Sequence, residues 1–404
     1  MPLAKEHAGA DTLSLVQKGE DFSLVLGGPL YQLYLRAHLS APPLELLRRR
    51  VLIISLICWL PLLILSAVSG HLYGGVALPF LPDVEVHVRF LAAVPLLIVA
   101  EVIVHRRIVT VVRQFLERNI IAAEDRSRFD RIIVSTMRLR NSALFEVALL
   151  IFCFTFGQWF WKDRVALAIP TWYSSVAGGR SLLTKAGYWY VFVSLPLFRF
   201  LLFRWYYRLL LWYQFLWRVR GLPLHLNLYH PDACGGLGFL ASSVPAFAPV
   251  LLAQTILLSG LIGDRIWHAG ANLLAFKMEI VGLVLFLMLL VLAPLTFFAM
   301  HLEHAGRIAA REFGILSSHY VNSFRNKWVR HGSRETEPLL GTPDLQSLAD
   351  LGNSFKSVRD IRLIPFGKDT VVRLGGVLLL PLLPLILTII PLKEIVDWAI
   401  KLVF

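Results

Sequence analysis

Long runs of apolar residues, separated by short polar segments, extend over most of the chain. A helix needs about 20 residues to cross the hydrocarbon core of a bilayer. Apolar runs of that length occupy residues 51–70, 86–104, 142–161, 188–207, 244–262, 280–300 and 374–392. The pattern predicts an all-α integral membrane protein with about seven transmembrane helices. Three prolines interrupt the last run, which is therefore also compatible with a re-entrant segment.

Proline falls within six of these seven runs, so several of the helices should be kinked. The residues are Pro61, Pro95, Pro196, Pro249, Pro294, and Pro381 with Pro384. Broken helices around a polar cavity are typical of transporters and channels. Proline is also commoner in membrane helices than in soluble ones, so the kinks alone do not decide the function.

The segments between the spans predict further helices on or beyond the membrane surface. Residues 29–39 are short, aromatic and mildly amphipathic, as expected of an interfacial helix. The chain therefore divides into a cytoplasmic N-terminal segment, a six-helix membrane core, a cytoplasmic helical loop, and a C-terminal membrane helix with an amphipathic tail. These parts cover residues 1–50, 51–300, 301–373 and 374–404, and the core includes a cytoplasmic helical hairpin at 105–141 and a loop at 208–243.

Charge sets the expected orientation. Only 17% of the 404 residues are charged, against about 25% in a soluble domain, and the net charge is +13. The loops after the second and sixth runs hold 9 and 11 Lys and Arg, and those after the first, third and fifth hold 0, 4 and 2. Because basic loops stay in the cytoplasm, the N-terminus and the even-numbered loops are expected there. This distribution explains the charge without nucleic acid, which is not expected as a partner.

The ends and the cysteines bear on location. The first 20 residues are polar and the first apolar run begins only at Val51, so no signal peptide is evident. Of the cysteines, Cys58 and Cys153 lie in apolar runs, so with Cys234 they do not indicate a disulfide framework. We expect a multi-pass protein of the plasma membrane, the inner membrane in a bacterium. Its partner is the lipid bilayer, and the chain is compatible with a homo-oligomer.

Four ionisable residues within the spans form the first candidate site. Glu101, Glu146, Arg199 and Arg204 all fall in the inner half of the bilayer when their depth is counted at helical rise. An unpaired charge there is costly, so these residues should pair or line a water-filled vestibule. We predict that Arg199 lies within ion-pair reach of Glu101 or Glu146. The alternative is that the side chains extend to the inner interface.

The loop at 227–239 is the second candidate site. It contains His230, Asp232, Cys234, Gly235, Gly236 and Gly238. A metal site here would use His230 and Asp232 with His301 and His304 at the end of the sixth span, although no recognised zinc spacing is present. The glycines also suit contact with an anion or lipid headgroup, or a rigid turn. We predict that the loop folds against the end of the sixth span, near His301 or His304.

Three functions remain open on the sequence. Neither a phosphate-binding loop nor a hydrolase motif is present, and the sequence indicates no cofactor. The broken helices and intramembrane charges favour membrane transport of a small solute or ion. A membrane-embedded enzyme at the inner leaflet, and a scaffold or signalling subunit using residues 301–373, are the alternatives. Bound metal would favour the enzyme. A continuous polar path across the membrane would favour transport, and an exposed docking surface would favour the scaffold.

Overall fold

The computed structural model describes residues 22–37, 46–160, 170–177, 180–330 and 343–388. Helices make up most of this part of the chain. The strands described there are β1 (Ser174–Ala177) and β2 (Arg180–Leu183), which form an antiparallel hairpin with Ser174 opposite Leu183.

The helices follow one another in hairpins and continuous pairs. In chain order they are α2 (Pro29–Arg36), α3 (Leu47–Val68), α4 (Val84–Val88), α5 (Val94–Glu117), α6 (Arg126–Arg140), α7 (Ala143–Phe160), α8 (Lys185–Trp189), α9 (Leu195–Arg220), α10 (Ala248–Ala269), α11 (Lys277–Leu292), α12 (Ala299–Phe324), α13 (Pro343–Arg359), α14 (Lys368–Leu379) and α15 (Leu383–Ile386).

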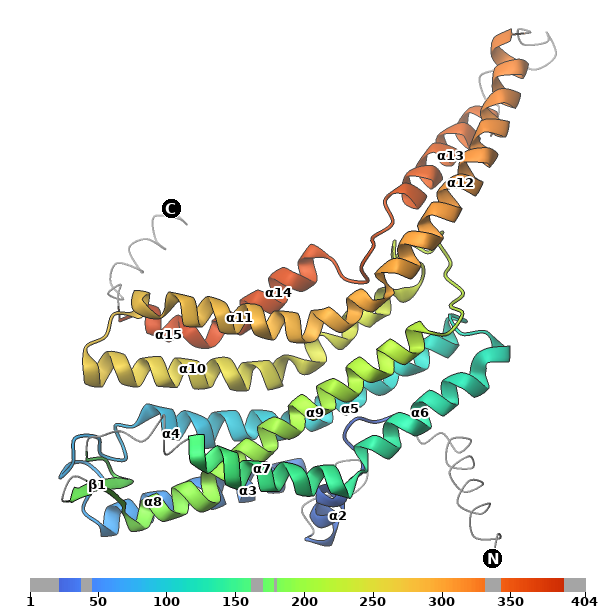
Figure 1. Cartoon of the computed structure of the whole chain (residues 1–404). Helices are drawn as coiled ribbons and strands as arrows, with labels where there is room; N and C mark the ends of the chain where they lie inside the picture. The colour runs from blue at the N-terminus through green and yellow to red at the C-terminus, as the bar shows by residue number, and fades with distance from the viewer. Residues whose placement is uncertain (1–21, 38–45, 161–169, 178–179, 331–342, 389–404) are drawn as a thin grey trace, which may run out of the picture.

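These helices form two layers and a projecting arm (Figure 1). Helices α10, α11, α14 and α15 lie in one layer, and α3, α4, α5, α7, α8 and α9 in the other. Helix α10 packs against α4 and α5 and so joins the layers. We call the end that carries the β-hairpin the hairpin side. The opposite end, from which α12 and α13 project as the arm, is the arm side.

The described chain has six helices long and apolar enough to cross a membrane, where the sequence predicted about seven. They are Leu47–Val68, Val84–Glu117, Lys185–Arg220, Leu237–Ala269, Leu273–Arg330 and Lys368–Ile386. The predicted run at 142–161 accounts for the difference: it falls on α7 (Ala143–Phe160), whose side chains are described only from Ala143 to Thr155, and this described stretch alone is too short to cross a bilayer. Helices α5 and α9 both run towards the arm side, so α6 and α7 return the chain between them (Figure 1).

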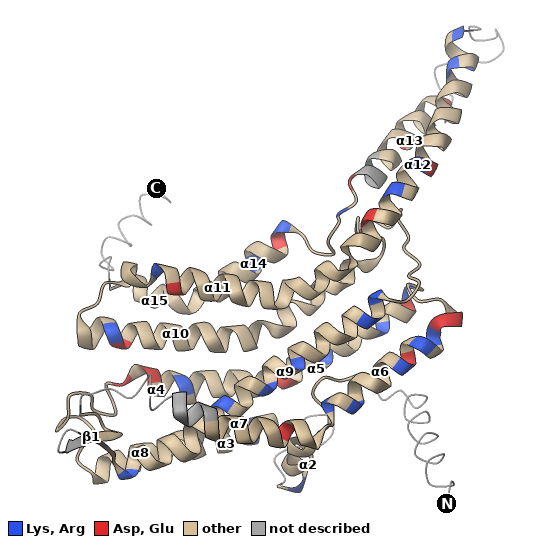
Figure 2. Cartoon of the chain, viewed as in Figure 1, with Lys and Arg blue, Asp and Glu red and all other residues tan. Residues whose placement is uncertain are grey.

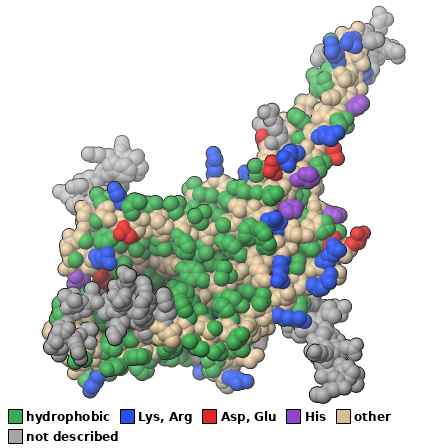
Figure 3. Space-filling view, viewed as in Figure 1, with side chains coloured by type: hydrophobic (Ala, Val, Ile, Leu, Met, Phe, Trp, Pro, Cys, Tyr) green, Lys and Arg blue, Asp and Glu red, His purple; other side chains and the backbone are tan. Residues whose placement is uncertain are grey.

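Side chains on the outside of the layers agree with a lipid environment. Large apolar residues of α11 are exposed, among them Met278, Leu285 and Leu289, and α3 and α7 expose similar rows. Apolar side chains cover the visible face of the layers (Figure 3), while charged residues are frequent on the arm and at the arm side of α5, α6 and α9 (Figure 2). The structure therefore has the surface of a multi-pass membrane protein.

Most of the prolines predicted to kink helices stand where the helix type changes. A π-helical turn, Arg89–Ala93, precedes Pro95 at the start of α5, and a second, Tyr190–Ser194, precedes Pro196 at the start of α9. A π turn widens the helix and often marks a functional position. Pro294 and Pro381 lie in 3₁₀ turns instead.

The region predicted as a cytoplasmic helical loop forms the arm. Helix α12 continues into a π-helical end, Arg325–Arg330, and α13 runs back along it. The rings of Phe313 and Phe355 stack with centroids 5.9 Å apart, and Lys327 pairs with Asp344 at 2.8 Å. Helix α13 thus docks on α12.

Candidate functional site

A buried cluster of charges lies between α3, α5 and α9, and Glu101 is at its centre. Arg50 Nη2 is 3.0 Å from Glu101 Oε2, and Arg208 Nη2 donates to Oε1 at 2.8 Å. Arg204 Nη1 is 3.4 Å from the same oxygen. The side chains of these three arginines and Glu101 are at most 6% exposed. One carboxylate therefore receives three guanidinium groups out of contact with solvent.

Glu146 on α7 extends the cluster to the N-terminal segment. Its Oε1 is 3.2 Å from Arg204 Nη2, and its Oε2 accepts a hydrogen bond of 2.8 Å from the backbone N–H of Leu30. Leu30 is in the first turn of α2, where the residue before the helix, Gly28, offers no side-chain cap. A carboxylate at a helix N-terminus satisfies free N–H groups and is favoured by the helix dipole. Glu146 thus caps α2 from another helix.

Aromatic rings cover the guanidinium groups. Arg50 lies over the ring of Tyr34 at 5.4 Å, and Arg208 over Trp205 at 4.6 Å. Cation–π contacts of this kind stabilise a desolvated cation. Burial raises the pKa of Tyr34 to about 12, and the nearby Glu101 charge adds to the shift, so the phenol stays protonated.

Positive charge exceeds negative charge in this cluster. Among the described residues it holds three guanidinium groups against the two carboxylates of Glu101 and Glu146. A fourth cation, Arg140, stands nearby, and burial together with the charge of Arg204 lowers the pKa of Arg140 to about 10. The site is therefore electrostatically suited to a further anion.

Arg50 also has donors to spare. Its Nε, Nη1 and Nη2 atoms are buried and find no hydrogen-bond partner among the described residues, although Nη2 forms an ion pair with Glu101 Oε2 at 3.0 Å. Buried N–H groups in folded proteins are nearly always paired. Nitrogen atoms without a hydrogen-bond partner on a fully buried guanidinium thus suit an acceptor that the described side chains do not provide.

Arg199 does not take the place predicted for it. Within the described chain it makes no ion pair with Glu101 or Glu146, and Arg204, Arg208 and Arg50 do so instead. At about 100° per residue, position 199 faces about 140° away from position 204 and 180° away from position 208. Arg199 Nη1 is buried without a hydrogen-bond partner among the described residues.

A second group of charges lies near the hairpin side. It was not predicted as a site from the sequence. The Asp264 carboxylate accepts hydrogen bonds from the N–H groups of Val84 and Glu85, at 2.9 and 2.8 Å, at the start of α4. Glu85 pairs with Arg89, which donates to the hydroxyl of Tyr190. Arg89 and Tyr190 begin the π turns that precede Pro95 and Pro196. Helices α4, α9 and α10 are thus tied together at this end.

Asp83 adds a titratable group beside that network. It accepts hydrogen bonds from Trp172 Nε1 at 2.8 Å and from the N–H of Val86 at 3.1 Å. Burial raises the pKa of the Asp83 carboxyl to about 7, against the opposing effect of the Trp172 hydrogen bond, and the charges of Asp264 and Glu85 raise it further.

The loop at 227–239 is organised by Asp232. Its Oδ1 accepts from the N–H groups of Cys234 and Gly236, at 2.9 and 3.1 Å, and its Oδ2 from Gly238 at 2.8 Å. Burial alone would raise the pKa of Asp232, but these hydrogen bonds outweigh it and hold the pKa below its usual value. His230 Nδ1 lies 3.1 Å from Asp232 Oδ1. The carboxylate is thus fully engaged within the loop.

The glycines of this loop allow the chain to turn around the Asp232 carboxylate. Gly235 and Gly236 have φ values of +62° and +93°, which side-chain-bearing residues rarely adopt. A Cβ atom on Gly238 would lie 2.9 Å from atoms of Asp232. The chain therefore closes tightly around the carboxylate.

The loop does pack on α12, but His230 and Asp232 do not join His301 and His304. Neighbouring residues make the contact, since the ring of Tyr229 lies 5.9 Å from that of Phe313. In the part of the chain that the structure describes, no group of three or more His, Cys, Asp or Glu residues could hold a metal ion. The predicted metal set of His230, Asp232, His301 and His304 is therefore not assembled, because Asp232 is already satisfied by backbone N–H groups.

Comparison with known proteins adds no relative. No family model, no curated protein and no solved structure matches the chain.

Proposed function

We propose that the protein transports a small anion across the membrane and that the buried guanidinium cluster is its binding site. The observation that supports this most is the surplus of positive charge. Three guanidinium groups face two carboxylates, and all five side chains are between 0 and 9% exposed. Ionisable groups within membrane spans commonly belong to functional sites, because their burial in lipid is costly.

The hydrogen-bond inventory points in the same direction. A guanidinium carries five N–H donors, and an ionised carboxylate accepts about four hydrogen bonds. Three arginines thus present about fifteen donors to about eight acceptor positions. An anion at Arg50 Nε and Nη1, two of the three Arg50 nitrogens without a hydrogen-bond partner, would supply missing acceptors and the missing charge.

A second consideration is the cost of leaving the surplus uncompensated. A charge transferred from water to a protein interior costs several kcal/mol even after relaxation. Burial of three cations around Glu101 and Glu146 is reasonable if the site also holds an exchangeable anion. Release of that anion would then be coupled to a rearrangement of the carboxylates, as transport requires.

The distribution of basic loops gives the proposed orientation. On the positive-inside rule the arm side faces the cytoplasm, and the cluster lies in the inner half of the bilayer. Arg199, with its unpartnered Nη1, and the Arg89–Tyr190 pair continue the polar groups towards the outer side. The π turns beside that pair provide places where α5 and α9 could shift.

Anion flux into proteoliposomes tests the proposal. Purified protein is reconstituted, and uptake of radiolabelled phosphate, sulfate and chloride is measured against protein-free vesicles. We expect saturable uptake of at least one anion and its loss in Arg50→Gln, which keeps a polar side chain but removes the charge. Arg128→Gln, at a side chain 60% exposed on α6, is the matched control and should transport normally.

Two results would overturn the proposal. The first is that none of the three anions enters faster than in protein-free vesicles although the protein is folded and inserted. The second is that Arg50→Gln transports as well as Arg128→Gln.

A second candidate, a membrane scaffold, is favoured by the arm. Its two helices expose large apolar residues, including Ile315, Leu316 and Leu345, to the surroundings of the described chain. Deletion of the arm would then abolish assembly with a partner and leave anion flux unchanged.

A further inference from the structure

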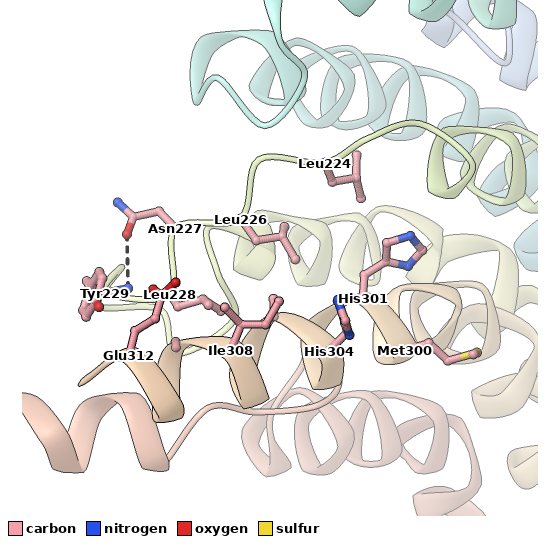
Figure 4. Close-up of a pocket in the computed structure, with 12 residues that line it drawn as sticks. Leu224, Leu226, Asn227, Leu228, Tyr229, Met300, His301, His304, Ile308 and Glu312 are labelled. Carbon is pink, nitrogen blue, oxygen red and sulfur yellow. Dashed lines mark hydrogen bonds between the residues drawn. The ribbon is translucent and has the colours of Figure 1, made fainter. Parts of the chain in front are cut away.

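A groove lies at the base of the arm, apart from the charged cluster. It has a volume of about 650 Å³ and is formed by the segment 224–229 on one side and by the first four turns of α12 on the other. Figure 4 shows Leu224 and Leu226 above Ile308, His301 and His304. Ligand sites commonly measure about 300–1,000 Å³. The groove is thus large enough for part of a small amphipathic molecule.

The lining changes in character along the groove. Leu226, Leu228, Met300 and Ile308 provide apolar walls, and His301 and His304 provide polar groups. His301 Nδ1 is buried and has no hydrogen-bond partner among the described residues. Arg220, at the end of α9, is close enough to act on the charge of His301. One end of the groove therefore offers imidazole hydrogen-bonding groups beside an apolar surface, with the guanidinium group of Arg220 nearby.

The position of the groove matches the surface of the membrane. Met300 ends the apolar stretch of the fifth spanning helix, and His301 is its first ionisable side chain on the arm side. Trp217 packs on Phe297 with ring centroids 5.1 Å apart, and Arg220 lies over Trp217 at 4.3 Å. Tryptophan and arginine at this level are typical of the headgroup region.

We infer that this groove binds an anionic phospholipid of the arm-side leaflet. The phosphate lies at His301, His304 and Arg220, and one acyl chain passes Met300 into the apolar part of that leaflet. The inference is independent of the transport proposal, because the groove and the charged cluster share no residue. A lipid fits better than a soluble anion because the apolar walls would otherwise face water beside the membrane.

Lipid retention in native mass spectrometry tests the inference. The full chain is purified in detergent and titrated with phosphatidylglycerol or with phosphatidylcholine. We expect a preference for phosphatidylglycerol that falls about tenfold in the double variant His301→Ala/His304→Ala, since two hydrogen-bonding contacts to the phosphate are lost. His319→Ala, an exposed histidine farther along α12, is the matched control and should keep the preference.

Two further measurements distinguish the contribution of the acyl chain from that of the headgroup. Met300→Ser should lower retention of both lipids, and its thermal unfolding midpoint shows whether the chain is folded. Glycerol phosphate, the headgroup without acyl chains, should compete only weakly. Equal retention of the two lipids, a preference that survives the double variant, or competition by glycerol phosphate as strong as by the lipid would each overturn the inference.

Discussion

Replacing Glu101 with Gln removes the carboxylate that three arginines share. The side chain is almost the same size, so the change is one of charge. Removal of one partner from a buried ion pair costs about 3–5 kcal/mol, because the remaining charge stays buried and unpaired. Glu101 contacts Arg50, Arg204 and Arg208 at 2.8 to 3.4 Å, so we expect a loss of folding free energy in this range.

Thiol reactivity on heating provides the assay. The three cysteines, Cys58, Cys153 and Cys234, are free and buried, so a maleimide dye reacts with them only as the protein opens. Glu101→Gln should shift the transition to a clearly lower temperature. The double variant Glu101→Gln/Arg208→Gln should recover part of the loss, since it removes one of the unpaired charges.

The matched control is Glu303→Gln on the arm. Glu303 pairs with Arg307 at 3.2 Å, but the two side chains are 51% and 70% exposed, and such a pair contributes about 0–1 kcal/mol. If Glu101→Gln melts with the wild-type protein and the Glu303 control, Glu101 does not hold the cluster together and the reasoning fails.

Three other sites give separate tests. Gly28 has φ +86°, and an added Cβ would lie 2.9 Å from Glu146 Oε1, so Gly28→Ala should destabilise by about 1 kcal/mol or more in thermal unfolding. Gly74→Ala, with open space around it, is the control. Asp83 keeps its proton in the folded state up to about pH 7, so stability should fall as pH rises from about 4 to 7, and Asp83→Asn should flatten this profile. Asp232→Ala leaves three backbone N–H groups without their acceptor, so amide hydrogen exchange in the loop should accelerate; unchanged protection would contradict the role assigned to this carboxylate.

The spans could be predicted because the thickness of the bilayer fixes how long an apolar run must be to cross it. Six of the seven predicted runs coincide with helices long enough to cross. The run at 142–161 coincides with α7 (Ala143–Phe160), of which only Ala143–Thr155 enters the described apolar stretch, so this run is not among the six. The helices expected in the hairpin at 105–141 were found as the end of α5 and as α6, and the helical loop predicted after the sixth run contains most of α12.

The ion pairs could be predicted only in part. Depth along a helix follows from counting residues, which is why Glu101, Glu146 and Arg204 were selected. The direction in which a side chain points depends on rotation about the helix axis, and this excluded Arg199. Arg50 was not selected as a site residue because it follows Arg48 and Arg49, and such a basic group before a span usually marks its cytoplasmic end. In the structure Arg50 is fully buried.

The loop at 227–239 shows a different limit. Its contact with α12 was predicted from the cost of unpaired polar groups at an interface. The partners of Asp232 were not, because backbone N–H groups two to six residues ahead satisfy a short carboxylate without any distant residue. The sequence alone does not show whether Asp232 bonds to these nearby N–H groups or to histidines of another segment.

Charge movement on an anion jump tests most directly whether the buried cluster holds an exchangeable anion. Proteoliposomes on a solid-supported membrane are exposed to a step in phosphate, sulfate or chloride, and the transient current is recorded. The surplus of guanidinium groups predicts a saturable current of negative charge with at least one of these anions, and its loss in Arg50→Gln. The absence of any transient in folded wild-type protein, or an equal current in Arg50→Gln, would contradict it.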